Sequence, residues 1–330
     1  MSRNPARLAL NRDILFATAL IALCIAWLAY IASALDLGLL VRVLLNGTEM
    51  GLTYLLIAWG LTLMFGVMHL LNFAHGEFFM LGAFMVWYFM ERNSFLAQLV
   101  ASPWDYLLAA LLAIAIVGLL GILVERFLFR PFKQDVLPAF IISLGVGMIL
   151  QTAMLGAFGL QPKSIPTVFE GGQRVAGAFI SNERLALLVV ALIVMASTTF
   201  LVLRTKPGRA IRAIRDDEDA AALQGMNIGR YRSLVMLIGC ALAAIAGALY
   251  GPIYQVEPFM GVAPLSKAFA IIILGGVGSL PGAVLGGFFI GFVQSFGATT
   301  FGASIADMLS FVIIILVLLF KPRGLMGRDH

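Results

Sequence analysis

The chain has 330 residues, of which 61% are hydrophobic and only 12% are charged, and its formal net charge is +5. Soluble domains usually contain about 25% charged residues, so this composition excludes an ordinary soluble enzyme and predicts that most of the chain faces lipid or other apolar helices. The basic residues lie at the ends of apolar runs, which indicates membrane topology and argues against nucleic acid as a partner.

The N-terminal region predicts a first membrane span. Three arginines precede an apolar run at 14–34, which ends in Ala32-Ser33-Ala34, a sequence similar to a signal-peptidase site. The apolar run of a signal peptide has about 7–15 residues, and this run is longer. We therefore expect residues 1–39 to form a cytoplasmic tail and an uncleaved span.

Apolar segments recur along the whole chain, as expected for an all-α, polytopic membrane helix bundle. They lie at 14–34, 42–66, 70–90, 106–124, 138–158, 185–203, 233–251, 265–278, 281–297 and 305–320. Segment 265–278 is short and rich in glycine, and either 70–90 or the 265–297 pair fits a re-entrant hairpin. The sequence therefore predicts eight to ten transmembrane helices with broken or re-entrant segments. The loop at 159–184 is too short for a domain and suggests a plug or docking lip.

The positive charges predict the orientation. If the N-terminus is cytoplasmic, ten crossings return the C-terminus to the cytoplasm, and sixteen of the 22 Lys and Arg then lie in cytoplasmic segments. This bias follows the positive-inside rule. A topology with eight crossings has the same orientation, so both termini are expected in the cytoplasm.

Polar residues interrupt the apolar sequence just before segment 70–90. Asn72 can cap a helix that begins near Phe73, and Glu77 then lies in its first turns, at the positive end of the helix dipole. One hypothesis is a broken helix that lines a translocation path. The other, which we favour, is a cap and kink that hold two helices together. The candidate residues are Asn72, His75, Gly76 and Glu77. A metal site is disfavoured, because His75 and Glu77 are two residues apart and point in different directions on a helix.

A series of glycines predicts close helix packing near the C-terminus. The spacing of Gly278, Gly282 and Gly286 places glycines on one helix face, although Pro281 indicates that the helix begins there. Faces at 247–251 and 278–291 need helix partners, and we expect a second chain to contribute to them. A part in the translocation path is the alternative; the candidates are Gly275, Gly276, Gly278 and Ser279.

Several motifs of catalysis are absent from the sequence. It contains no G-x-x-x-x-G-K-S/T phosphate loop, no H-E-x-x-H and no G-x-S-x-G. We therefore expect a chain without enzymatic activity or a cofactor of its own. A secondary carrier or channel is a weaker alternative, because few acidic residues lie in the apolar segments.

The polar segment 204–232, here called the coupling loop, contains seven Lys and Arg and the pattern acidic-Ala-Ala-x-x-x-Gly at 219–225. We expect Asp216 to Asp219 in the first turn of a short helix, an alanine face that enters a groove on a partner, and a left-handed Gly225. Asn227 then helps to close the turn. A solvated linker is the alternative. The candidate coupling residues are Arg212, Arg215, Asp216, Asp219, Ala220, Ala221, Gly225 and Asn227.

This pattern resembles the loop by which permeases of bacterial ABC importers dock onto their ATPases. The resemblance extends to GLTYLLIAWGLTLMFG at 51–66, LNFAHGE at 71–77, PGRAIRAIRD at 207–216, LGGVGS at 274–279 and FKPRGL at 320–325. Together these motifs are similar to the first, H-type permease of branched-chain amino acid importers. The resemblance covers residues 40–325 as one permease domain and leaves 326–330 as a cytoplasmic tail.

The resemblance implies the partners and the location. It implies a heterodimer with a second related permease, two cytoplasmic ATPase subunits that bind ATP and Mg, and a periplasmic substrate-binding protein, assembled in the bacterial inner membrane and in contact with its lipid. It also implies leucine, isoleucine or valine as substrate. Permeases of urea and short-chain amide importers are very similar, so these substrates are the alternative.

Overall fold

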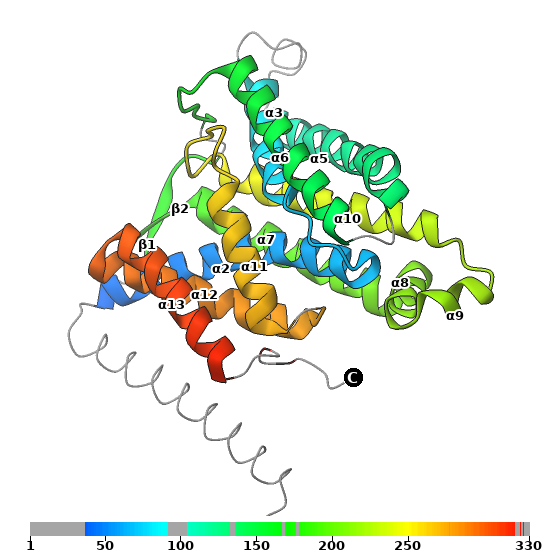
Figure 1. The fold of residues 1–330 in the computed structure, drawn as a ribbon. Helices are drawn as coiled ribbons and strands as arrows, with labels where there is room; N and C mark the ends of the chain where they lie inside the picture. The colour runs from blue at the N-terminus through cyan, green and yellow to red at the C-terminus, as the bar shows by residue number, and fades with distance from the viewer. Residues whose placement is uncertain are drawn as a thin grey trace, which may run out of the picture.

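The structure is a computed structural model that describes residues 37–91, 104–132, 136–166, 169–175, 178–276, 278–320, 324 and 326. It is a bundle of apolar helices around a buried core (Figure 1). The first predicted span at 14–34 and the predicted tail at 326–330, apart from Met326, lie outside the described residues.

Each of the other nine predicted apolar segments corresponds to a helix, and two further helices occupy the coupling loop. The helices are α2 (Leu37–Met68), α3 (His75–Met90), α5 (Asp105–Val124), α6 (Val136–Phe158), α7 (Asn182–Arg204), α8 (Lys206–Asp216), α9 (Glu218–Leu223), α10 (Ile228–Tyr250), α11 (Val262–Gly275), α12 (Leu280–Phe301) and α13 (Ala303–Phe320). A π-helical turn, η1 (Glu125–Phe129), and a 3-10 turn, η2 (Arg130–Phe132), extend α5.

The helices differ in their ability to span a bilayer. Six helices of the described part are long and apolar enough to cross: α2, α5 with its extension, α6, α7, α10 and α12. Helix α3 has 16 residues and α11 has 14. At 1.5 Å per residue they are about 24 Å and 21 Å long, which is less than the ~30 Å hydrocarbon core. Helix α11 is thus short, as its segment predicted, and α3 is shorter than the apolar segment 70–90, whereas α12 has the length of a full span.

Glycines permit a close contact between α2 and α12. A Cβ atom at Gly291 would lie 2.4 Å from the Gly47 carbonyl oxygen and 2.5 Å from the Gly51 Cα. One at Gly51 would lie 3.1 Å from the Gly287 carbonyl oxygen. Since backbone meets backbone here, only residues without a side chain permit this distance.

The other predicted glycine faces are also covered by helices of the same chain. Gly282 in α12 packs on Gly275 of α11, where a Cβ would lie 2.0 Å from the Gly275 carbonyl oxygen. Gly286 lies against Ile271 of α11, and Gly247 of α10 packs on the backbone of Phe79 in α3. The expectation that these faces need a second chain is therefore wrong.

The loop at 159–184 contains a structure that the sequence did not predict. Strands β1 (Gly172–Val175) and β2 (Ala178–Ser181) form an antiparallel hairpin, in which Gly172 pairs with Ser181. Lys163 forms an isolated bridge with Val256, in the loop between α10 and α11. The hairpin leads directly into α7, whose other end leads into α8, so it lies at the opposite end of this span from the coupling loop (Figure 1).

Candidate coupling surface and polar clusters

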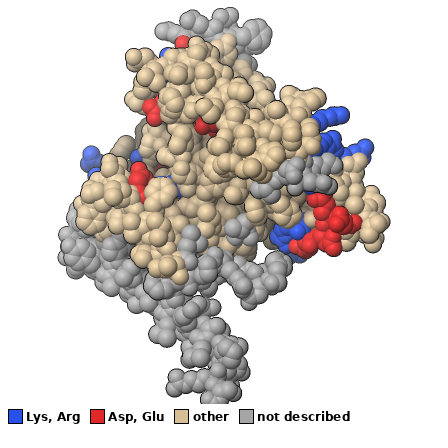
Figure 2. Space-filling view, in the orientation of Figure 1, with Lys and Arg blue, Asp and Glu red and all other residues tan. Residues whose placement is uncertain are grey.

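The coupling loop forms two short helices that project from one end of the bundle. Figure 2 shows that acidic and basic side chains gather over α8 and α9, while apolar and uncharged residues cover most of this view. Thr205 caps α8, because its side chain accepts a hydrogen bond from the Gly208 backbone N–H at 3.2 Å. The loop is therefore an ordered, charged surface.

Helix α9 carries its acidic residues at the N-terminus, as predicted. Asp217 is the N-cap and accepts a hydrogen bond from the Ala220 N–H at 2.9 Å, and Glu218 and Asp219 occupy the first turn. Asp216, however, is the last residue of α8 and pairs with Arg215 at 2.9 Å. The expectation that it belongs to the first turn of α9 is wrong, because α8 continues to Asp216 and the extended Asp217 separates the helices.

Gly225 ends α9 in a left-handed conformation, with φ of +79°. Its N–H donates to the Ala222 carbonyl at 2.9 Å, and the Met226 N–H donates to the Ala221 carbonyl at 3.2 Å. These two bonds form a Schellman motif, the usual end of a helix at glycine. Asn227 does not close this turn; its side chain caps α10 by accepting from the Arg230 N–H at 3.1 Å.

The exposed face of α9 differs from the predicted alanine face. Ala221 is 4% exposed and packs inward, whereas Ala220 and Ala222 are exposed and Leu223 is 88% exposed. A leucine so far in solvent is the kind of side chain that a groove on another protein can bury. The available docking surface is therefore Ala220, Ala222 and Leu223, next to the acidic residues of the first turn.

The two predicted arginines make contacts within the chain. Arg212 donates from Nη1 to the Val202 carbonyl oxygen at 2.5 Å and so satisfies the C-terminal end of α7. The side chain of Arg215 lies against Gly66 at the end of α2. A residue that the sequence analysis did not select, Arg232, pairs with Glu218 at 2.7 Å and fastens α9 to α10. These arginines position the loop.

At the helix break, α3 begins two residues later than predicted. His69 has a φ of +54°, and Asn72 accepts a hydrogen bond from the Ala74 N–H at 3.0 Å, just before the helix. Asn72 is therefore not the N-cap, which is Ala74. His75 lies fully buried, with Nε2 3.2 Å from the Ile57 carbonyl oxygen, and a Cβ at Gly76 would lie 2.5 Å from the Gly261 oxygen.

Glu77 occupies the first turn of α3 and is 6% exposed. Its Oε2 atom is buried and has no hydrogen-bond partner among the described residues. The carbon chain lies against α6, where a Cβ at Gly147 would be 3.6 Å from Glu77 Cγ. The carboxylate is thus held at the positive end of the α3 dipole.

We expect Glu77→Gln to lower stability by about 0.3–2 kcal/mol, because the charge that favours the helix N-terminus is removed. Expression and thermal unfolding in detergent should fall more than substrate preference changes. Glu91→Gln, at the C-cap of the same helix, is the control and should not destabilise. A Glu77 variant of normal stability with an altered substrate profile would instead place this side chain in the translocation path.

The glycine-rich segment after α11 forms a turn. Gly276 and Gly278 have φ of +96° and +79°, and the Ser279 N–H donates to the Gly276 carbonyl at 3.0 Å. Ser279 caps α12 by accepting from the Gly282 N–H at 3.2 Å. Gly278 therefore lies outside the helix, as Pro281 indicated, and its conformation explains the glycine.

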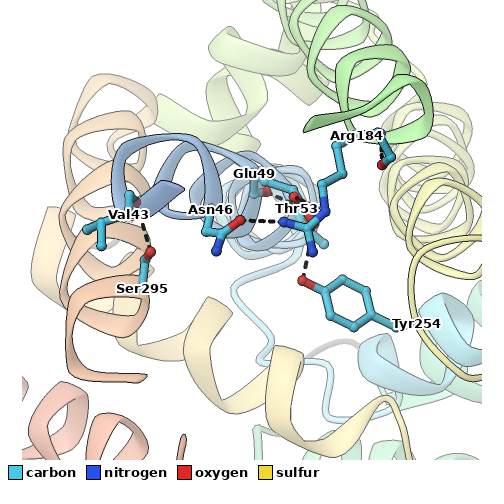
Figure 3. Close-up of polar contacts among 8 residues, drawn as sticks. Val43, Asn46, Glu49, Thr53, Arg184, Tyr254 and Ser295 are labelled. Atoms are coloured by element: carbon cyan, nitrogen blue, oxygen red, sulfur yellow. Dashed lines mark hydrogen bonds and ion pairs between the residues drawn. The ribbon is translucent and has the colours of Figure 1, made fainter. Parts of the chain in front are cut away.

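A cluster of polar side chains joins α2, α7 and the α10–α11 loop; we call Asn46, Glu49, Arg184 and Tyr254 the outer polar cluster (Figure 3). Glu49 is 2% exposed; its Oε2 lies 3.5 Å from Arg184 Nε, and its Oε1 accepts a hydrogen bond from the Tyr254 hydroxyl at 3.1 Å. Arg184 also donates to Asn46 Oδ1. Burial and the neighbouring carboxylate raise the pKa of Tyr254, so its hydroxyl stays protonated.

A second ion pair, between a buried lysine and a half-exposed aspartate, was also absent from the predicted sites. Lys267 in α11 is 2% exposed, and its Nζ lies 3.1 Å from Asp307 Oδ1 of α13. Gln294 of α12 donates to the same oxygen at 2.8 Å. The available signal in the sequence was an isolated lysine within an apolar segment, since such a charge needs a partner.

Comparison with known proteins agrees with this architecture. Residues 43–318 match the family model described as branched-chain amino acid transport system / permease component. The chain belongs to this permease family. The permease is 36% identical to the high-affinity branched-chain amino acid transport system permease protein BraD of Pseudomonas aeruginosa, over 87% of this chain and 95% of BraD.

Two proteins of Escherichia coli are also similar to this permease. It is 34% identical to LivH, over 86% of this chain and 94% of LivH. It is 27% identical to LivM, over 94% of this chain and 74% of LivM. Both proteins are described as permease proteins of a high-affinity branched-chain amino acid transport system. The protein is thus a transport subunit that crosses the membrane several times.

Proposed function

We propose that the protein is the membrane permease of an ATP-driven importer that carries leucine, isoleucine and valine across the bacterial inner membrane. The observation that carries the ATP-driven part is the surface of α9. It is an ordered helix with exposed Ala220, Ala222 and Leu223 and acids at its N-terminus. A carrier that works alone does not need such a face outside the bundle, whereas a permease driven by ATPases does.

The partners follow from the same proposal. Two cytoplasmic ATPases bind ATP and Mg and receive α9 of each permease. Similarity to both LivH and LivM supports a second, related permease in a heterodimer, and a periplasmic binding protein delivers the substrate. With the coupling loop in the cytoplasm, the β1–β2 hairpin and the outer polar cluster face the periplasm, and both termini are cytoplasmic.

Leu223→Ser tests the docking surface. The side chain is 88% exposed, so the variant should keep the stability of the wild type, because surface substitutions usually change it by less than about 0.5 kcal/mol. Co-purification of the ATPases and substrate-stimulated ATP hydrolysis in liposomes should fall at least about tenfold, as for a buried contact at an interface.

An exposed leucine elsewhere on the permease serves as the control. Leu137→Ser changes a side chain that is 69% exposed at the start of α6, and it should leave ATPase binding intact. If Leu223→Ser retains wild-type ATPase binding and coupling, α9 is a solvated linker, and the case for an ATP-driven importer loses its structural support.

A further inference from the structure

The outer polar cluster lies at the end of the bundle that is opposite to the coupling loop. Arg184 is in the first turn of α7, whereas the coupling loop begins where this 23-residue helix ends, at Arg204. Figure 3 shows the Arg184 side chain reaching from α7 to Glu49 and Asn46 of α2, with the Tyr254 ring approaching from another side. If the coupling loop is cytoplasmic, this cluster is where substrate enters.

A buried charge in a membrane helix is expensive, so such residues are usually paired and functional. Glu49 provides one carboxylate and Arg184 one guanidinium, and they come from different helices. Together they present one negative and one positive group side by side. An α-amino acid has the complementary pair, an ammonium group and a carboxylate on one carbon atom.

We propose that the outer polar cluster is a binding site for the zwitterionic head of an α-amino acid. The substrate carboxylate binds the guanidinium of Arg184, which has the planar donor geometry that suits a carboxylate. The substrate ammonium binds the carboxylate of Glu49 and the side-chain Oδ1 of Asn46. No bond is made or broken; the substrate exchanges partners with an existing ion pair.

The geometry of the unliganded pair supports such an exchange. The Arg184 Nε to Glu49 Oε2 distance is 3.5 Å, longer than the 2.7–2.9 Å of a strong charge-assisted hydrogen bond. The Arg184 side chain is 35% exposed, so a solute can reach it, while Glu49 is 2% exposed behind it. The Tyr254 hydroxyl holds Glu49 Oε1 in place at 3.1 Å. The pair is thus long for an ion pair and accessible from one side.

This inference rests on the proposed function and makes it more specific. Urea and simple amides are neutral, so they cannot replace both charged partners of the pair. If one of them separated Glu49 from Arg184, both charges would be left uncompensated. A zwitterion compensates both at once. The cluster therefore favours amino acids over urea as the substrate class.

The competing explanation is that the ion pair is purely structural and joins α2, α7 and the α10–α11 loop. Replacing both charged residues by neutral ones distinguishes this explanation from a substrate site. A buried ion pair with only a structural role can often be replaced by neutral groups without loss, whereas removing one partner is harmful. A substrate site needs the charges themselves. The variants are Glu49→Gln, Arg184→Gln and the double variant with both changes.

The experiment uses the assembled transporter in liposomes, with its binding protein saturated with radiolabelled L-leucine. We expect each single variant and the double variant to take up leucine at least about tenfold more slowly, since a desolvated charge partner is lost. Thermal unfolding of the double variant should match the wild type. Ser295→Ala is the control; it removes a neutral hydrogen bond of 2.8 Å to the Val43 carbonyl in the same region and should leave uptake unchanged.

The outcomes are distinct. Leucine uptake by the double variant at the wild-type rate would overturn the zwitterion site and leave a structural lock, and so would a loss of uptake that merely follows a loss of folded protein. If the wild-type transporter imports urea and not leucine, the proposed substrate itself is wrong. An Arg184→Lys variant with intermediate uptake would support the site, because it keeps the charge without the planar geometry.

Discussion

Gly291→Ala is expected to separate α2 from α12 and to destabilise the protein by about 1–3 kcal/mol, the usual cost of overpacking. The added Cβ would lie 2.4 Å from the Gly47 carbonyl oxygen and 2.5 Å from the Gly51 backbone nitrogen. Both contacts are with backbone, which cannot rotate away as a side chain can. The measurement is the fraction of monodisperse protein that survives a heating series in detergent.

Gly156→Ala is the matched control for this effect. Gly156 lies in the α6 helix, and nothing lies within 4 Å of a Cβ built there. Alanine has a better helix propensity than glycine, so this variant should be as stable as the wild type or more stable. If Gly291→Ala unfolds at the wild-type temperature, the close contact of α2 and α12 does not exist in the membrane protein.

Gly225→Val is expected to leave the permease folded in the membrane but to release its ATPases or uncouple hydrolysis from uptake. Nothing lies within 4 Å of a Cβ at this position, so the effect comes from the backbone conformation, with φ of +79°. A β-branched residue is strained there by about 1–3 kcal/mol. Relief of that strain would disrupt the Schellman motif and move Leu223, the exposed side chain on the last turn of α9.

Asparagine provides the control at this position, because it tolerates the left-handed region better than other residues with a side chain. Gly225→Asn should therefore retain most of the ATPase binding, measured by co-purification and by substrate-stimulated hydrolysis in liposomes. Wild-type coupling in Gly225→Val would show that the end of α9 carries no part of the contact.

Much of the architecture could be predicted from patterns along the chain. Each apolar segment within the described residues became a helix, because a chain in lipid must satisfy its backbone hydrogen bonds internally. The end of α9 was predictable for a local reason: the left-handed conformation at Gly225 is rare for residues with a side chain. The start of α12 next to Pro281 followed from the same kind of local rule.

The predictions that were wrong concern contacts between segments that are distant in sequence. Glycine spacing indicated that a helix would come close, but α2, α3 and α11 of the same chain cover these faces. The three alanines of α9 look alike in sequence, yet only Ala221 is buried, because α9 is fastened to α10 through Glu218 and Arg232. Asn227 belonged to the next helix rather than to the preceding turn.

By itself, the sequence determined the membrane class, the helices and the position of the charged segment 204–232, since hydrophobic runs, capping residues and glycines act over a few neighbouring residues. Only the tertiary structure decided which charges meet. Glu49 and Arg184 are 135 positions apart in sequence and form a pair because α2 and α7 pack together. A carboxylate in an apolar run needs a partner, but the run itself does not specify which residue this is. The packing of the helices determines it.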